Sequence, residues 1–336
     1  MLKEKTLAQL RGKKNLLAFS AGVDSTALLF LLKQHNIIFD IAIVNYGIRK
    51  QSLQEVAYAK SLTCEDLISV CRVFNAPKIS NNFESNARKI RYKFFEELIS
   101  TYRYENLLTA HHLGDRFEWM LMQFCKGAGC IEIAGMQDFE AREGYNIVRP
   151  LLHVDKQELL CFLNTHNIKY FEDETNLDEN IQRNSFRHKH TNPLLHKYRS
   201  GIKKSFEYID IDREILTPHV EIKSINGFTY FKSSQNSRID IFTIDKILKS
   251  QGYMLSAKER ELLKNEKTIV AGRKFIINQD RNLIFIVPYT KNRSDFIMPH
   301  AFKEKCRTLK IEPKLRPYLY IDKEAFNYFC TVFFVP

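Results

Sequence analysis

The sequence contains no CxxC pair, although seven cysteines occur along it. Their number is odd and their spacing irregular, so we expect neither a disulfide framework nor a structural zinc site. Cysteines of this kind usually lie in the core and stay reduced. We therefore expect a reducing compartment, with Cys125 and Cys130 as core residues.

Long apolar runs are also absent. The longest, around Thr26–Leu32, is far too short to cross a bilayer. The first residues carry charge but no apolar stretch followed by a cleavage site, so we expect no secretory signal, no membrane association and a cytoplasmic protein. At 336 residues and 44% hydrophobic, the chain is long enough for two domains with substantial cores.

Acidic residues are missing between Arg183 and Lys204, where seven Lys or Arg and three His occur. The whole chain has a formal net charge of +12, which favours an anionic partner such as a nucleic acid. A solvated basic helix face is the alternative reading of this segment.

The first 150 residues alternate short apolar segments with amphipathic ones. The sequence predicts strands at 15–20, 39–45, 69–74 and 106–110, and helices at 24–33, 52–63, 84–102 and 114–124. This alternation indicates an α/β fold, a doubly wound, Rossmann-like parallel sheet with helices on both faces. Ligands of such folds bind at the carboxyl ends of the strands.

The pattern changes after residue 150. A helix is expected at 155–166, followed by an acidic loop at 171–176 and the basic segment. Farther along, the sequence predicts a smaller α+β domain, with helices at 243–251 and 256–265, strands at 268–277 and 283–288, and a strand-rich aromatic tail at 315–336. We expect domains at 1–196 and 241–336, joined by a helical linker at 197–240.

Small and hydroxyl-bearing residues link the first predicted strand to its helix: Ser20, Ala21, Gly22, Val23, Asp24 and Ser25. Backbone N–H groups in the first turn of a helix are unpaired and favour phosphate. Asp24 is suited to hold Mg²⁺ or to cap the helix. The pattern GxxxxGK[ST] is missing, so this is no Walker loop. An ordinary strand–turn–helix junction capped by Asp24 is the alternative.

Ser20–Ser25 resembles the SGGxDS loop of PP-loop ATP pyrophosphatases, which cleave ATP between the α and β phosphates and adenylate a substrate. The resemblance implies that these six residues bind ATP, and that Asp24 is catalytic and holds Mg²⁺. Ala21 stands where the family has its first glycine. If that position requires a positive φ, alanine is strained there.

Further segments resemble the lysidine synthases, one family within this class. In family order they are 44–49 (VNYGIR, followed by Ser52 and Glu55), 84–92 (ESNARKIRY), 109–118 (TAHHLGDRFE), 149–152 (RPLL), 172–176 (EDETN) and 183–187 (RNSFR). With the phosphate loop they cover most of residues 15–195. Tyr46 replaces the histidine of the family, and Gly114 and Trp119 also depart from its pattern.

Lysidine synthases attach free L-lysine to C2 of the wobble cytidine in the CAU anticodon of tRNA(Ile), which changes the codon from AUG to AUA. The resemblance implies ATP and Mg²⁺ as cofactors. It also implies tRNA(Ile) with the CAU anticodon and free L-lysine as partners, and an accessory tRNA-binding domain at 241–336. Adenylation makes the C2 oxygen a good leaving group, which the lysine ε-amine then displaces. Such an enzyme needs an ATP cradle, an anionic cage and a basic RNA surface.

Two acids are candidates for the anionic cage. Asp115 and Glu118 are three residues apart, so one helical face would present both carboxylates. The resemblance implies that they bind lysine and that Asp115 takes part in catalysis. A solvated pair of acids is the alternative. His111 and His112, just before them, are either catalytic or neutral, hydrogen-bonded core residues.

Four arginines are candidates for contacts with phosphate or tRNA, because the planar guanidinium suits phosphate oxygens. They are Arg88, Arg91, Arg183 and Arg187. For both pairs, Arg88 with Arg91 and Arg183 with Arg187, the alternative is an exposed, solvated side chain.

Other functions remain open from the sequence alone. A tRNA thiolase of the same class relies on reactive cysteines or an iron–sulfur site, for which no CxxC pair is present. A non-catalytic RNA-binding module would show no ATP/pyrophosphate exchange, and a nitrogen-transferring synthetase for a small metabolite would turn over without RNA. The sequence does not determine the oligomeric state and leaves a homodimer open.

Overall fold

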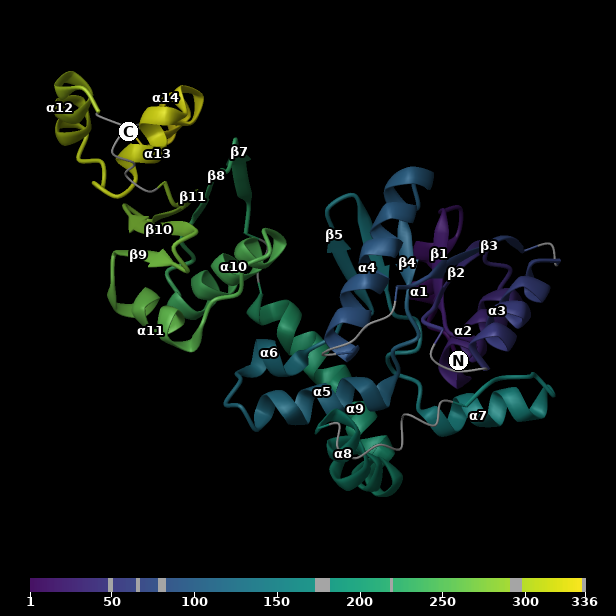
Figure 1. The fold of residues 1–336 in the computed structure, drawn as a ribbon. Coiled ribbons are helices and arrows are strands. Elements are labelled where there is room, and N and C mark those ends of the chain that lie inside the picture. Colours follow the sequence, from purple (N-terminus) through teal and green to yellow (C-terminus); the bar gives the residue numbers. More distant parts are fainter. Residues whose placement is uncertain are drawn as a thin grey trace. The chain divides into compact units, whose positions relative to one another are not determined.

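The protein is described by a computed structural model that covers residues 1–47, 51–64, 67–77, 83–172, 182–217, 220–290 and 298–333. The chain forms two compact units, Met1–Ile215 and Leu216–Pro336 (Figure 1). Each unit has its own sheet and its own core.

The first unit is built on a six-stranded sheet in the order β3-β2-β1-β4-β6-β5. Its strands are β1 (Asn15–Phe19), β2 (Phe39–Asn45), β3 (Ile68–Asn75), β4 (Asn106–Leu108), β5 (Phe139–Arg142) and β6 (Tyr145–Val148). All neighbours are parallel except β5, which runs antiparallel to β6. The carboxyl ends of β1, β2 and β4 therefore share one edge.

Helices cover both faces of this sheet. They are α1 (Glu4–Leu10), α2 (Val23–Gln34), α3 (Gln51–Ser61) with a 3₁₀ turn η1 (Leu62–Cys64), α4 (Phe83–Tyr102), α5 (Leu113–Phe124), α6 (Cys130–Ala134) and α7 (Lys156–Thr165). Successive strand residues point to opposite faces. Leu17 of β1 joins the core under α1, α2 and α7, whereas Leu16 packs with Phe95 of α4. The predicted doubly wound sheet is confirmed.

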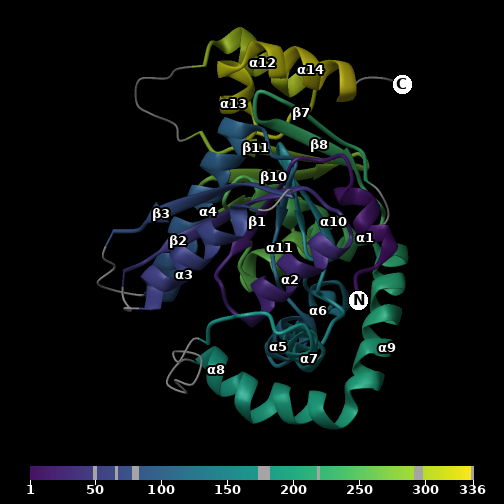
Figure 2. The same cartoon turned by 90° about the vertical axis from the view of Figure 1, so that its right-hand side faces the viewer.

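A long helical stretch closes the first unit. It runs from α8 (Gln182–Phe186) through a π-helical turn, η3 (Arg187–Thr191), into α9 (Asn192–Leu216). Figure 2 shows its curved course. Within α9, Tyr198 leaves helical geometry (φ −126°, ψ 23°) at a kink. Leu195 and Phe206 of α9 pack on Leu113 and Phe117 of α5. That packing attaches the basic segment to the helix that carries the two candidate acids.

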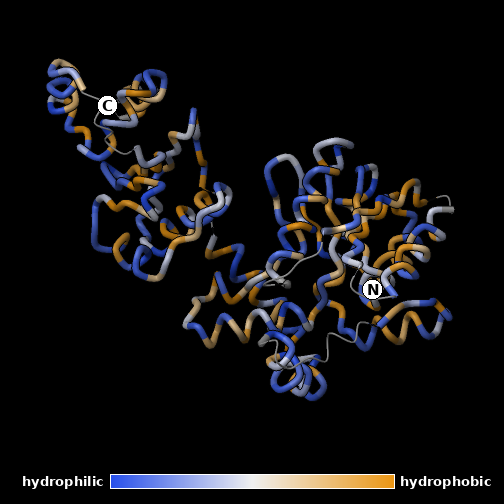
Figure 3. Tube along the Cα trace, viewed as in Figure 1, coloured by the Kyte–Doolittle hydropathy of each residue, from blue (hydrophilic) through white to orange (hydrophobic). Residues whose placement is uncertain are grey.

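The second unit is a five-stranded antiparallel sheet in the order β7-β8-β11-β10-β9, with helices against it. Its strands are β7 (Ile222–Ile225), β8 (Phe228–Lys232), β9 (Thr268–Ala271), β10 (Phe275–Asp280) and β11 (Leu283–Pro288). Its helices are α10 (Ser237–Ser250), α11 (Ala257–Asn265), α12 (His300–Thr308), α13 (Arg316–Ile321) and α14 (Lys323–Phe333). Figure 3 shows hydrophobic residues alternating with hydrophilic ones along the helices of both units. The predicted smaller α+β domain is confirmed.

Two expectations for this part of the chain are wrong. The segment 197–240 is helical only to Leu216 and again from Ser237, because β7 and β8 between them join the second sheet. The tail is helical rather than strand-rich. Its aromatic residues favour strands, but Ala325, Phe326 and Phe329 are buried at helical spacing in α14.

The cysteines also differ from expectation. Cys125 and Cys130 are exposed instead of lying in the core, because they fall at the end of α5 and the start of α6, where the chain turns. In the described ranges, no helix has the length and apolar character needed to cross a membrane.

Candidate active site at the carboxyl edge of the sheet

The phosphate loop is held together by Ser25. The Ser20 N–H donates to Ser25 Oγ (3.2 Å), the two hydroxyls are 3.1 Å apart, and Ser25 Oγ–H donates to the Gly22 carbonyl (3.2 Å). Gly22 is the N-cap of α2 and supplies no side-chain cap. The first N–H groups of α2 therefore face the strand edge without a helical partner and can bind phosphate.

Ala21 adopts the left-handed conformation that glycine favours, with φ 58°. Its side chain is fully buried. Its carbonyl accepts the Phe171 N–H (2.9 Å), and Gly22 bridges to Phe171 as in a parallel ladder. The loop thus has the left-handed backbone conformation at this position, although the residue is alanine and not glycine.

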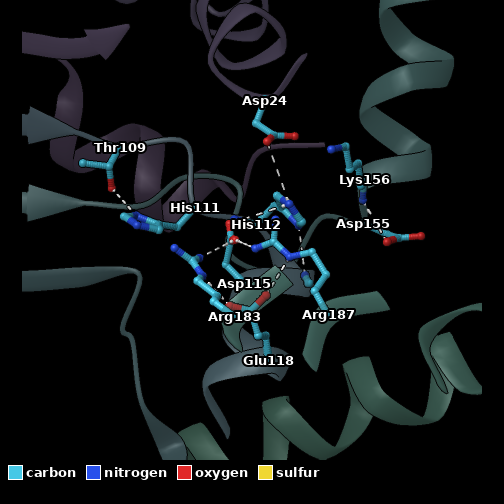
Figure 4. A network of polar contacts seen from close by, with 11 residues as sticks. Asp24, Thr109, His111, His112, Asp115, Glu118, Asp155, Lys156, Arg183 and Arg187 are labelled. Carbon is cyan, nitrogen blue, oxygen red and sulfur yellow. Dashed lines mark hydrogen bonds and ion pairs between the residues drawn. The ribbon is translucent and has the colours of Figure 1, made fainter. Parts of the chain in front are cut away.

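Asp24 is not a helix cap, because it lies one residue inside α2. Its Oδ1 is buried and has no hydrogen-bond partner among the described residues. Its Oδ2 lies 3.9 Å from Nε2 of His112 (Figure 4). An orphaned carboxylate oxygen beside a phosphate cradle is the kind of ligand that Mg²⁺ takes together with phosphate oxygens. The capping alternative is wrong, and the residue fits the metal.

His112 lies between the phosphate loop and the acids. The backbone N–H of Gly114 donates to His112 Nδ1 (3.0 Å). The other ring nitrogen, Nε2, lies 3.6 Å from Asp115 Oδ2 and 3.9 Å from Asp24 Oδ2. The backbone N–H of His112 donates to Asp115 Oδ2 (3.0 Å), which completes a capping box at the start of α5.

His111 points to a different partner. Its Nδ1 lies 2.8 Å from the hydroxyl of Thr109. Burial lowers the pKa of this imidazole to about 4, with smaller opposing and supporting effects from nearby charges. The ring is therefore neutral and hydrogen-bonded near pH 7. The hydrogen bond and the lowered pKa thus favour the neutral, hydrogen-bonded alternative for this residue.

Asp115 and Glu118 are buried, and two arginines that lie 65 to 72 residues later in the chain pair with them (Figure 4). Arg187 Nη2 lies 2.6 Å from Asp115, and its Nε lies 2.6 Å from Glu118. Arg183 bridges the same two acids, with its Nη2 3.1 Å from Asp115. The four side chains form one cluster of charge-assisted hydrogen bonds. The alternative of a solvated acid pair is wrong.

The electrostatics of the cluster favour the charged forms. Burial alone would raise the pKa of Asp115, but His112 and Arg187 beside it hold that pKa well below its ordinary value. Burial likewise opposes the charge on Arg187, while Asp115 and Glu118 raise its pKa. Each buried charge is therefore compensated by its partner, as a buried ion requires.

The basic segment is not isolated from acids in three dimensions. Besides the cluster, Arg199 pairs with Asp155 (3.0 Å) and Lys203 with Glu158 (2.7 Å), both at the start of α7. Lys204 pairs with Glu207. The absence of Asp and Glu between 183 and 204 therefore does not mean that the positive charges of this segment are unpaired, because α5 and α7 supply acids.

Arg88 and Arg91 lie one turn apart on α4 and are exposed. The Arg88 guanidinium stacks 4.7 Å from the ring of Tyr92. Arg91 Nε–H donates to the hydroxyl of Tyr46 (3.3 Å), directly after β2. The sequence predicted these arginines but not their tyrosine partners. Residues 48–49 and 173–176 of the matching segments lie outside the described residues.

The fold and the loop define the class of protein. A family model described as the PP-loop domain matches residues 2–194. The chain has the ATP-binding fold of the PP-loop ATP pyrophosphatases, and Ser20–Ser25 lead from β1 into α2 within the matched range.

Curated relatives identify the family within that class. The tRNA(Ile)-lysidine synthase of Helicobacter pylori (strain ATCC 700392 / 26695) is 43% identical over 330 residues, covering 97% of this chain and 96% of that protein. Those of Wolinella succinogenes and Campylobacter jejuni (strain RM1221) are 42% and 40% identical and cover 93% and 96% of this chain, and 94% and 97% of their own lengths. The chain belongs to the tRNA(Ile)-lysidine synthase family of ATP-dependent ligases.

Among solved structures, the U34-tRNA thiolase NcsA from Methanococcus maripaludis is similar with a TM-score of 0.51 and 18% identity. The match covers 66% of this chain and 78% of that one. At this identity the likeness shows the fold alone. It adds nothing to the thiolase alternative.

Proposed function

We propose that this protein ligates free L-lysine to C2 of the wobble cytidine in the CAU anticodon of tRNA(Ile), forming lysidine in the cytoplasm. ATP and Mg²⁺ are the cofactors. The proposal is supported by membership of the family and by one observation above all: His112 lies between Asp24 of the phosphate loop and Asp115 of the acid pair. An acidic site for an ammonium group thereby lies next to a cradle for phosphate.

In this proposal the residues Ser20–Ser25 bind the phosphates of ATP through backbone N–H groups and hydroxyls. Asp24 Oδ1, which is buried without a partner, would hold Mg²⁺. Mg²⁺ bound there would offset negative charge on the phosphates. Asp24 is thus the proposed metal-binding and catalytic residue of the loop.

Asp115 and Glu118 bind lysine in this proposal. Two guanidinium groups already contact these carboxylates, which supports the proposal that the pair binds a cationic N–H donor. A lysine ammonium donates three hydrogen bonds and can replace one guanidinium. Asp115 also contacts His112, whose Nε2 lies 3.9 Å from Asp24 Oδ2.

The reaction has two bond exchanges. The cytidine C2 oxygen attacks the α-phosphorus of ATP, an O–P bond forms, and pyrophosphate leaves with the electrons of the broken bond. The ε-amine of lysine then attacks C2. The C2–O bond breaks, AMP leaves with that oxygen, and the amine loses its proton as the C–N bond is completed. Arg88, Arg91, Arg183 and Arg187 are the proposed contacts to phosphate groups of the substrates.

The direct test is lysine incorporation. Enzyme, ATP, Mg²⁺ and radiolabelled lysine are incubated with a CAU-anticodon isoleucine tRNA transcript, and label in RNA is counted together with AMP and pyrophosphate. Asp24→Asn keeps the shape of the side chain but removes charge, so we expect incorporation to fall roughly 100-fold or more with an unchanged melting temperature. Products of ADP and phosphate, turnover without RNA, or no label in the RNA would refute the proposal.

A further inference from the structure

Tyr46 lies at the active edge of the sheet. It follows Asn45, the last residue of β2, and β2 is parallel to β1, whose carboxyl end carries the phosphate loop. In the segment that resembles the lysidine synthases, histidine is the family residue at this position. The proposed function gives this tyrosine no role.

The Tyr46 hydroxyl makes two contacts with α4. It donates a hydrogen bond to the carbonyl of Ala87 (3.0 Å) and accepts one from Arg91 Nε–H (3.3 Å). Ala87 is buried, so its carbonyl is a fixed anchor. A single hydroxyl can donate once and accept at the same time, which both bonds require. Tyr46, in the loop after β2, therefore links the Arg91 side chain to the backbone of α4, the helix that carries Arg91.

This contact leaves the outer end of Arg91 available. Nε is bonded to Tyr46, and throughout the described ranges no hydrogen bond or ion pair is made by the two Nη groups of Arg91. These are the atoms with which a guanidinium grips phosphate. Holding the stem in place reduces the conformational entropy that an exposed arginine loses when it binds.

The neighbouring Arg88 places this part of α4 beside the site. It lies one turn before Arg91 and stacks on Tyr92. Burial is the main cause of the lowered pKa of His111, but the positive charge of Arg88 also contributes to it. Arg88 is therefore within electrostatic reach of the strand edge where ATP and RNA meet in the proposed function.

We propose that Tyr46 is a positioning residue, which holds Arg91 in place to bind a phosphate group at the carboxyl edge of the sheet. The phosphate belongs to the RNA backbone or to ATP. The inference rests on the proposed function, because it takes the phosphates from those two substrates.

A double-mutant cycle tests it. Tyr46→Phe, Arg91→Ala and the double variant are compared with wild type in lysine incorporation, with KM for tRNA and for ATP measured separately. We expect Tyr46→Phe to raise one of these KM values roughly 3- to 10-fold, as for loss of one hydrogen bond. In the Arg91→Ala background the same change should have no effect. Melting temperatures should stay close to that of wild type.

Tyr92→Phe is the matched control, because Tyr92 is on the same helix and serves Arg88. Its effect should add to that of Arg91→Ala. A rise in the tRNA KM assigns the phosphate to RNA, and a rise in the ATP KM assigns it to ATP. If Tyr46→Phe has no effect, or the same effect with and without Arg91, the inference is overturned. Incorporation by the wild type tests the proposed function separately, so the two failures are distinguishable.

Discussion

At the scale of single residues, the phosphate loop places alanine, Ala21, in the left-handed backbone conformation that glycine favours. A non-glycine residue at φ 58° is disfavoured, yet Ala21 is held there by its hydrogen bond to Phe171 and by complete burial. The surrounding structure therefore determines the conformation of this residue. The loop geometry is maintained by contacts and not by glycine.

The strain leads to a stability prediction. Ala21→Gly removes a buried methyl group but relieves the left-handed strain, so the two effects should offset each other to within about 1 kcal/mol. Ala27 is equally buried but lies inside α2. Ala27→Gly loses the methyl group and also helix propensity, and should cost about 2 kcal/mol. Equal losses for both variants in urea unfolding would contradict the strain.

At the scale of elements, the site depends on a match between two helices. Asp115 and Glu118 lie three apart on α5, and Arg183 and Arg187 lie four apart on the stretch from α8 into η3. Both spacings place side chains on one face of a helix. η3 is π-helical, and such turns are frequent at functional sites. The two arginines occupy the place that lysine would take in the proposed function.

This arrangement predicts competition between lysine and the arginines. Arg183→Gln with Arg187→Gln leaves two buried carboxylates without their arginine partners, which should lower the melting temperature, since breaking a buried ion pair typically costs about 3–5 kcal/mol. Added lysine should then raise the melting temperature more than it does in wild type, because its ammonium restores a partner. Melting curves with and without lysine measure both effects.

The control for that experiment is Asp115→Asn with Glu118→Gln. These amides are poor partners for an ammonium group, so lysine should give no stabilisation in this variant. An equal lysine-induced shift in wild type and in the arginine variant would mean that lysine binds elsewhere.

At the scale of the whole molecule, the net charge is unevenly distributed between the two units. Residues 216–336 contain 21 Lys and Arg against 12 Asp and Glu, so they carry +9 of the total +12. The first unit carries only +3, and several of its basic side chains are paired with acids. Long-range attraction of an RNA backbone should therefore come mainly from the second unit.

Salt titration of tRNA affinity tests this distribution. Lys310, Lys314 and Lys323 are exposed around α12–α14. Replacing all three with glutamine should flatten the log–log salt slope by up to about 3, if each contacts one phosphate. Arg183→Gln with Arg187→Gln should change the slope less, because these charges are already neutralised. The opposite ranking would place the main RNA contact in the first unit.

The sequence by itself determined β1–β4, α2–α5 and α7 of the first unit and the class of chemistry, but not α1, α6, β5 and β6. Strand and helix patterns, the Ser20–Ser25 loop and the ordered motifs are local signals, and the apolar periodicity that carries them is visible along the chain. In the second unit the same reasoning found α10, α11 and β11. It failed in the tail, where aromatic composition outweighed the helical spacing of α14.

Only the tertiary structure decided which charges meet. Arg187 pairs with acids 69 and 72 residues away, and no periodicity connects positions so distant in the chain. The apparent acid-free basic segment, the tyrosine that holds Arg91 and the orphaned oxygen of Asp24 arise in the same way. Each depends on which helices and strand ends the packed core brings together, because charges act through distances in space and not through separation in sequence.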